Sequence, residues 1–283
     1  MKDSSHTWEQ AVVSLLENGE HEELVRACYY DQPLIGAADR FWKSPEWAAT
    51  RGLLGEVTGS ALDLGAGRGI ASYALARDGW RVTALEPDPS SVVGADAIRG
   101  LAKLAHLDVR VVQERGESLP FPAASFDLAY ARAVLHHARD LVGFAKEVSR
   151  VLRPGGRLVA VREHVVSSLR QLPSFLEGHP LHHLYGGENA FVLGAYMGAL
   201  RSAGLQVETV IGPFASPINY APRSREDLRD FVESAVRRVT GVVVAHAALR
   251  QDFVFDLILA VLNVVDRRPG RLNSFVARKP GTT

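Results

Sequence analysis

Short apolar segments alternate with helix-like segments through residues 58–164 of this 283-residue chain. The apolar segments are "SALDLG", "RVTALEP", "LDVRVVQE", "FDLAYARAV" and "RLVAVREH". Helical spacing is present in "GIASYALARDG", "SSVVGADAIRGLAKLA" and "DLVGFAKEVSRVLRPGG" between them. Such alternation is typical of a parallel sheet covered by helices on both faces. Because the crossovers in such sheets are right-handed, the simplest topology is an open, doubly wound α/β sheet.

The segments on either side of this core are predicted to add a cap. Residues 1–57 have apolar residues at helical spacing and are expected to form an N-terminal helical cap. Residues 165–283 are expected to complete the sheet with "QVETVIG" and "RLNSFVARK", and to carry two helical substrate-cap insertions, 165–204 and 213–268. We expect the cap and both insertions to lie over the carboxyl edge of the sheet, where open α/β sheets bind ligands.

Charge and hydropathy argue against polyanion binding and membrane insertion. Lysine plus arginine equals aspartate plus glutamate, 32 against 32, so no overall field attracts nucleic acid or an anionic membrane. The N-terminal "MKDSSHTWEQ" is too polar for a signal peptide, and "FVFDLILAVLNVV", which contains Asp256 and Asn263, is predicted to be a buried helix. One cysteine, Cys28, leaves no disulfide within the chain. We expect a cytoplasmic protein with a small-molecule partner and no nucleic-acid or membrane partner. The sequence does not fix the oligomeric state, and a homodimer is one option.

Three glycines at alternate positions follow the first predicted strand, in "ALDLGAGRGI". A glycine turn between a strand and a helix lets the backbone approach a ligand and points free helix N–H groups at it. The spacing differs from the dinucleotide fingerprint, because Ile70 stands where the last glycine of that motif belongs. No Gly-Lys-Ser/Thr follows either, so the turn is not a P-loop. The loop is therefore predicted to hold something other than a pyrophosphate or a triphosphate.

Glu86 ends the second predicted strand, about 20 residues after the glycine loop, where a carboxylate can accept both hydroxyls of a ribose. A glycine loop combined with a ribose-binding carboxylate indicates an adenosine-type ligand.

Four segments, in this order, resemble the motifs of class I S-adenosylmethionine-dependent methyltransferases. They are "LDLGAGRG", "ALEPD", "GESLPFPAASFDLAYARAVLHH" and "VLRPGGRLVAV". The later "AGLQVETV" and "SFVARK" are similar to the last two strands of that family. The resemblance, to the small-molecule type with a methyltransferase-11-like core, implies a seven-stranded, mostly parallel, Rossmann-like sheet. Its final strand runs antiparallel between strands five and six. The implied cofactor is S-adenosyl-L-methionine, and the implied product is S-adenosyl-L-homocysteine.

The same resemblance implies roles for eight residues of these motifs. They are Asp63, Gly65 and Gly67 at the methionine part of the cofactor, Glu86 with Pro87 at the ribose, Gly116 and Glu117 at the adenine, and Arg132 at the methionyl or sulfonium end. Arg115 stands where many relatives have an aspartate for the adenine amine. Adenine is therefore expected to be held by backbone groups and Glu117.

Methyl transfer from a sulfonium is an in-line displacement, for which a protein mainly supplies positioning and a dry cavity. A general base is needed only for a protonated acceptor, and histidine suits that task. "LHHARD" places His136 and His137 just past the fourth strand, and we predict that at least one is catalytic; packing or helix capping is the alternative. Ubiquinone-type O-methyltransferases can bind a metal here through Glu-x-x-Glu-His. Ala133 and His136 replace those glutamates, so no metal is expected.

A second group of candidate side chains is in "EGHPLHHLYGGENAF". Its H-x-x-H-H spacing is compatible with a metal site but matches no closed zinc pattern. We predict that the group lines the substrate pocket, with helix capping or ordinary surface as the next alternative. The candidate substrate residues, including one at the end of the fifth strand, are His164, His179, His182, His183 and Tyr185.

The sequence thus favours S-adenosylmethionine-dependent methyl transfer to a small molecule. O-methylation is preferred over N- or C-methylation. Two alternatives stay open: another transferase or a cyclase on the same fold, and a non-catalytic regulatory subunit that binds S-adenosylmethionine.

Overall fold

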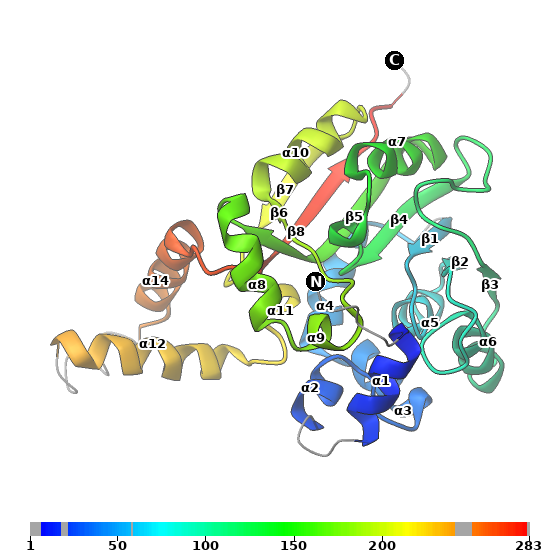
Figure 1. The fold of residues 1–283 in the computed structure, drawn as a ribbon. Helices are drawn as coiled ribbons and strands as arrows, with labels where there is room; N and C mark the ends of the chain where they lie inside the picture. Colours follow the sequence, from blue (N-terminus) through cyan, green and yellow to red (C-terminus); the bar gives the residue numbers. More distant parts are fainter. Residues whose placement is uncertain (1–6, 18–21, 58, 241–250, 282–283) are drawn as a thin grey trace.

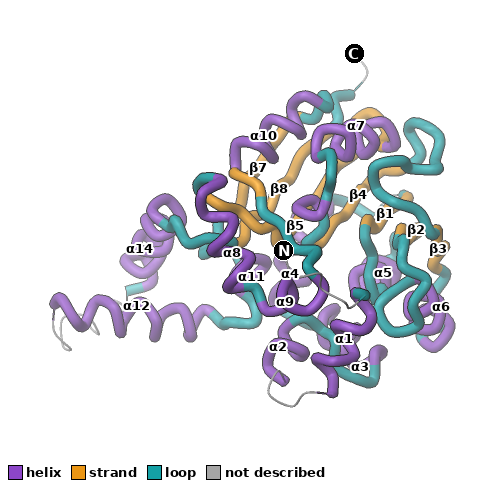
Figure 2. The backbone as a smooth tube through the Cα atoms, in the orientation of Figure 1, coloured by secondary structure: helices purple, strands orange, loops and turns teal. Residues whose placement is uncertain are grey.

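The computed structural model describes the chain except residues 1–6, 18–21, 58, 241–250 and 282–283. Its centre is an eight-stranded sheet with helices on both faces (Figure 1, Figure 2). The strands are β1 (Ser60–Leu64), β2 (Arg81–Leu85), β3 (Val109–Val112), β4 (Phe126–Arg132), β5 (Leu152–Val166), β6 (Phe191–Val192), β7 (Gln206–Ile211) and β8 (Arg271–Arg278).

The strand order is β3-β2-β1-β4-β5-β8-β7, with β6 pairing the end of β5. Neighbours from β3 to β5 are parallel, whereas β8 runs antiparallel to both β5 and β7. The predicted doubly wound α/β sheet is therefore confirmed, including the antiparallel last strand between the fifth and sixth strands of the prediction. The two-residue β6 was not predicted, because residues 165–204 were expected to contain only loop and helix.

Of the described helices, four precede the first strand, and the others lie between strands along the chain. They are α1 (Trp8–Glu17), α2 (Glu22–Ala27), α3 (Leu34–Trp42), α4 (Pro45–Leu54), α5 (Ile70–Arg77), α6 (Ala95–Leu104), α7 (Leu141–Val151), α8 (Leu172–Gly178), α9 (Pro180–Tyr185), α10 (Leu193–Ser202), α11 (Pro217–Tyr220), α12 (Arg225–Thr240) and α14 (Asp252–Val265), with short 3₁₀ turns η2 (Leu135–His137) and η3 (Leu169–Gln171).

The period of two along a strand divides the core between the faces of the sheet. In β1, Leu62 and Leu64 belong to the apolar cluster that contains Phe144 of α7. Ala61 belongs to a second cluster, which contains Trp47 of α4. Both faces of the central strands are thus buried, as expected for parallel strands between helical layers.

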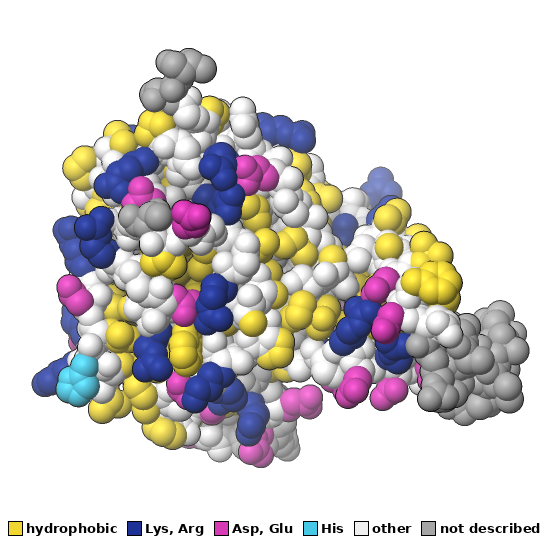
Figure 3. Space-filling model, turned by 180° about the vertical axis from the view of Figure 1, so that it is seen from behind, with side chains coloured by type: hydrophobic (Ala, Val, Ile, Leu, Met, Phe, Trp, Pro, Cys, Tyr) yellow, Lys and Arg dark blue, Asp and Glu magenta, His cyan; other side chains and the backbone are white. Residues whose placement is uncertain are grey.

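The second insertion differs from the expectation in its placement. Helices α12 and α14 pack on each other through a small cluster and project away from the sheet (Figure 1). "FVFDLILAVLNVV" was predicted to be a buried helix, but within α14 only Phe255 and Leu259 are buried. Figure 3 shows hydrophobic side chains exposed on this projecting part, where Phe253, Leu257, Val261 and Val264 are at the surface. The prediction was wrong because apolar composition alone does not reveal how much neighbouring structure is available to cover a helix.

Within the described residues, we find no helix that combines the length and the apolar character needed to cross a membrane.

Asp78, at the carboxyl end of α5, ties the N-terminal cap to the core. Its carboxylate accepts hydrogen bonds from Trp42 Nε1 at 2.7 Å, Trp47 Nε1 at 2.8 Å and Arg51 Nε at 2.7 Å. Trp47 is completely buried, so its indole N–H depends on this partner. The contact fixes α3 and α4 on one face of the sheet.

We expect Asp78→Ala to lower the free energy of unfolding by about 2–4 kcal/mol, because it leaves a buried indole donor unpaired and removes charge-assisted hydrogen bonds. Urea unfolding followed by tryptophan fluorescence measures the change. Asp96→Ala is the matched control, since Asp96 forms an exposed ion pair with Arg99 and should contribute less than about 1 kcal/mol. Equal effects of the two substitutions would contradict this role of Asp78.

Candidate active site

A cavity of about 540 Å³ lies at the carboxyl ends of β1, β2, β4 and β5. Figure 1 shows α1, α2 and α9 across this edge of the sheet, and residues from or next to each of them line the cavity. Of the site residues predicted from the sequence, those that line it are Asp63, Gly65, Gly67, Glu86, Pro87, Gly116, Glu117, Arg132, His136, His137, His164, His179 and Tyr185. The described residues of 213–268 contribute none, so the cavity is covered by the N-terminal cap and the first insertion.

His182 and His183, both predicted to contact substrate, lie outside the cavity lining. His183 is exposed, and its ring pairs with the backbone carbonyl of Glu177, at 2.5 Å from Nε2. His182 is half-buried in α9. The H-x-x-H-H spacing misled the prediction because successive positions of a helix point in different directions.

The glycine loop is open toward the cavity. Gly65 and Gly67 have φ angles of 58° and 55°, in the left-handed region that favours glycine. A Cβ on Gly65 would lie 2.8 Å from Val134 Cγ2, whereas a Cβ on Gly67 would meet nothing within 4 Å. Gly65 is thus required by close packing, and Gly67 leaves free space above its backbone.

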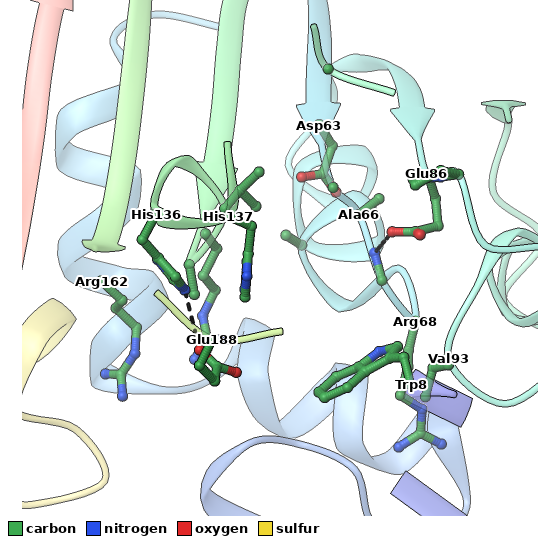
Figure 4. Close-up of a pocket in the computed structure, with 18 of the residues that line it drawn as sticks. Trp8, Asp63, Ala66, Arg68, Glu86, Val93, His136, His137, Arg162 and Glu188 are labelled. Atoms are coloured by element: carbon green, nitrogen blue, oxygen red, sulfur yellow. Dashed lines mark hydrogen bonds and ion pairs between the residues drawn. The ribbon is translucent and has the colours of Figure 1, made fainter. Parts of the chain in front are cut away.

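Glu86 is held against this loop (Figure 4). Its Oε2 accepts the Gly67 amide at 2.7 Å, and its Oε1 accepts the Asp88 amide at 3.0 Å. Burial raises the pKa of Glu86. Asp63, at the end of β1, accepts a hydrogen bond from Ser72 Oγ at 2.6 Å, and burial raises the pKa of Asp63 to about 7. Two carboxyl groups therefore flank the loop.

Residues 114–117 form one wall of the cavity. A Cβ on Gly116 would lie 2.1 Å from Phe144 Cε2, so only glycine fits beside this buried ring. Glu117 accepts the Arg139 amide at 3.2 Å.

Arg132 is paired with the cap, which the sequence did not reveal. Its Nε donates to Glu46 Oε1 of α4 at 2.7 Å, and Glu46 is almost completely buried. Arg162, also at the cavity, donates from Nη1 to the carbonyls of Ile218 and Ala221 at 2.9 and 3.0 Å. Burial lowers the pKa of Arg162.

Sequence reasoning missed Arg162, and also Trp8 and Arg68, as lining residues (Figure 4). Arg162 has a φ of 60° at a β-bulge between Ala160 and Glu163. No residue type in "VAVREH" predicts a β-bulge. Trp8 approaches the site only through the packing of α1.

Glu163 organises the turn that carries the two catalytic candidates. Its buried carboxylate accepts the amides of Val134 and Leu135 at 3.1 Å each and that of His136 at 3.0 Å. It also pairs with His136 Nδ1 at 2.8 Å. The opposite nitrogen, His136 Nε2, lies 3.7 Å from Glu188 Oε2. Burial alone would lower the pKa of His136, but the two carboxylates outweigh it and raise the pKa to about 9.

His137 and His164 each face a backbone carbonyl through Nδ1. His137 Nδ1 lies 3.0 Å from the Gly187 carbonyl oxygen, and His164 Nδ1 lies 3.0 Å from that of Gly270. A carbonyl can only accept, so each Nδ1 carries the proton and each Nε2 has a lone pair. Burial lowers the pKa of His137, and it lowers the pKa of His164 to about 3.

Glu188, in the loop between α9 and β6, contacts Tyr185 and lies near His136 and His179. Tyr185 donates its hydroxyl to Glu188 Oε1 at 2.7 Å, and burial together with this carboxylate raises the pKa of Tyr185. His179 Nδ1 lies 4.0 Å from the same oxygen. Its ring is 5.2 Å from that of His164.

The core of the chain is similar to known methyltransferases. Residues 62–160 match the family model described as a methyltransferase domain. A ubiquinone biosynthesis O-methyltransferase from Methylocella silvestris is 36% identical over 99 residues, which are 35% of this chain and 38% of the relative. The 27-O-demethylrifamycin SV methyltransferase of Amycolatopsis mediterranei is 34% identical over 152 residues, which are 52% of this chain and 54% of the relative.

Residues 62–160 are thus similar to a methyltransferase domain.

The chain spans about half or less of the length of these curated relatives. Structural similarity extends further. A geranyl diphosphate C-methyltransferase from Streptomyces coelicolor A3(2), solved with Mg²⁺, geranyl diphosphate and S-adenosyl-L-homocysteine, has a TM-score of 0.58 at 17% identity. The likeness covers 94% of this chain and 86% of that one, and at this identity it establishes the fold alone.

Proposed function

We propose that the chain transfers a methyl group from S-adenosyl-L-methionine to a small-molecule acceptor in the cavity, releasing S-adenosyl-L-homocysteine. The observation that carries the proposal is the open Gly67 position beside the buried Glu86 carboxylate. A nucleoside fits this arrangement because the loop leaves room for it and the carboxylate can accept its ribose hydroxyls. The family of the domain supports the same cofactor.

Each wall of the cavity near the glycine loop contacts a different portion of the cofactor in this proposal. Asp63 and the loop from Gly65 to Gly67 hold the methionine part, and Glu86 with Pro87 holds the ribose. The wall formed by Gly116 and Glu117 receives the adenine. Arg132, neutralised by Glu46, holds the cap against the sulfonium end and adds little net charge there. The cofactor supplies an already activated methyl group, so the protein has to position the acceptor and exclude water.

The acceptor is placed at the histidine end of the cavity, bordered by His164, His179 and Tyr185. O-methylation is the preferred reaction, supported by the similarity to the ubiquinone biosynthesis O-methyltransferase of Methylocella silvestris. His137 is the better base of the two catalytic candidates. Its Nε2 has the lone pair, whereas both nitrogens of His136 face carboxylates. N- and C-methylation remain the alternatives.

The proposed activity is tested with methyl-labelled cofactor and a panel of small phenols, alcohols, amines and carbon acids. We expect S-adenosylhomocysteine and one labelled product in equal amounts. Cofactor binding by calorimetry without turnover on any acceptor would favour a regulatory subunit. An unlabelled, rearranged product would favour a cyclase.

We expect Glu86→Ala to weaken binding of S-adenosylhomocysteine by about 1–3 kcal/mol, because it removes charge-assisted hydrogen bonds to the ribose. Isothermal titration calorimetry measures the change. Asp108→Ala removes an exposed carboxylate just before β3 and is the control. Unchanged affinity of the Glu86 variant would mean that the ribose is held elsewhere.

Once an acceptor is known, His137→Gln should lower kcat at least tenfold at saturating cofactor, since general base catalysis typically contributes a factor of about 10²–10⁴. Affinity for S-adenosylhomocysteine should change little. His106→Asn is the control, because His106 is exposed and its φ of 52° is one that asparagine adopts well. Wild-type turnover of the His137 variant would remove this histidine from the mechanism.

A further inference from the structure

The histidine end of the cavity contains three side chains that converge on one point. One imidazole nitrogen from each of His136 and His164 and one carboxylate oxygen of Glu188 all lie within 4.8 Å of one another. His136 and Glu188 are buried, and all three residues line the cavity. They come from separate parts of the fold: the turn after β4, the end of β5, and the loop between α9 and β6.

We propose that His136, His164 and Glu188 bind one divalent transition-metal ion. The proposal goes beyond the methyl transfer proposed above and does not depend on it. It also differs from the expectation drawn from the sequence, which placed no metal in this chain.

The nitrogens that face the point are the two Nε2 atoms. His136 Nδ1 is engaged by Glu163 at 2.8 Å, and His164 Nδ1 is engaged by the Gly270 carbonyl at 3.0 Å. With Nδ1 as the donor, Nε2 is the atom of each ring that is left for a metal. His164 already has a lone pair there, and at His136 the ion would displace the proton that the two carboxylates favour, because imidazole binds metals in its neutral form. Histidine ligands in metal sites almost always have their other nitrogen held by a carboxylate or a carbonyl in this way.

The carboxylate is held in the same manner. Tyr185 donates to Glu188 Oε1 at 2.7 Å, while Oε2 faces His136 Nε2 at 3.7 Å. Zinc bonds of about 2.0–2.2 Å to nitrogen and oxygen place tetrahedral ligands about 3.3–3.6 Å apart. The pair of His136 and Glu188 therefore needs only a small contraction to close around an ion, and the other pairs, all within 4.8 Å, need a larger one.

The donor set restricts the kind of ion. Two imidazoles and one carboxylate suit Zn²⁺, Fe²⁺, Co²⁺ or Mn²⁺, whereas Mg²⁺ and Ca²⁺ prefer oxygen ligands. Three protein ligands beside an open cavity leave a coordination position for water or for an oxygen or nitrogen of an acceptor. His179 adds a further donor nearby, since its buried Nδ1 has no hydrogen-bond partner among the described residues.

Zn²⁺ binding tests the proposal on the full chain purified without a histidine tag and stripped with a chelator. Titration in competition with a chromophoric chelator should give one Zn²⁺ per chain, and the cofactor is not needed. Co²⁺ should produce visible absorption bands of a four- or five-coordinate site, and Mg²⁺ at the same concentration should not bind. No saturable Zn²⁺ binding, or several weak equivalents without the Co²⁺ bands, would overturn the proposal.

Variants locate the ion. His164→Gln and Glu188→Gln should each weaken Zn²⁺ binding at least tenfold and remove the Co²⁺ bands, whereas His106→Asn should leave both unchanged. Zn²⁺ should also raise the Tm of the wild type, because it binds the folded state, but should not raise that of Glu188→Gln. Wild-type Zn²⁺ affinity in both cavity variants would place the ion elsewhere and refute the assignment. Because these measurements omit S-adenosylmethionine, their failure is distinguishable from failure of the proposed methyl transfer.

Discussion

The buried carboxylate of Glu163 is the interaction on which the site depends. A carboxylate without solvent is stable only when it is hydrogen-bonded or paired, because removing an ion from water costs several kcal/mol. Glu163 has three backbone amides and one imidazole around it. These donors hold the turn after β4 directly beyond Ala133, which has a positive φ of 58°. An unfavourable backbone conformation is thus kept in place by the same contact that orients His136.

That turn also reaches the other end of the cavity. Val134, whose amide is bound by Glu163, packs so close to Gly65 that no side chain fits there. The histidine end and the glycine loop are therefore fixed relative to each other through one turn. Precise relative placement of two binding regions matters for an in-line displacement, which tolerates little misalignment of the reacting atoms.

The cover of the cavity is built in two unequal parts. Helices α3 and α4 join the main core on one face of the sheet, and Glu46 of α4 pairs with Arg132. Helices α1, α2 and α9 instead share a small cluster of their own around Leu15, Val25 and Leu181. Trp8 and Tyr185 join this cluster with ring centroids 4.7 Å apart. The second part buries less apolar surface than the main core, so the contacts closing this side of the cavity are the weaker ones.

How much of the structure the sequence could predict depends on how far apart the interacting residues are along the chain. The parallel core of the sheet and the cavity-lining motif residues were predictable, because strand–helix alternation and the glycine loop are local patterns within residues 58–164. Contacts between distant residues were not, and the pairing of Arg132 with Glu46 and the bulge that exposes Arg162 to the cavity both belong to this class. The histidines illustrate the difference most clearly. Local spacing grouped His179 with His182 and His183, whereas folding places His136, His164 and Glu188 together, although the first and last of them are 52 positions apart (188 − 136). A ligand set assembled from a turn, a strand end and a loop leaves no local spacing to recognise, and only the folded backbone brings its atoms to one point.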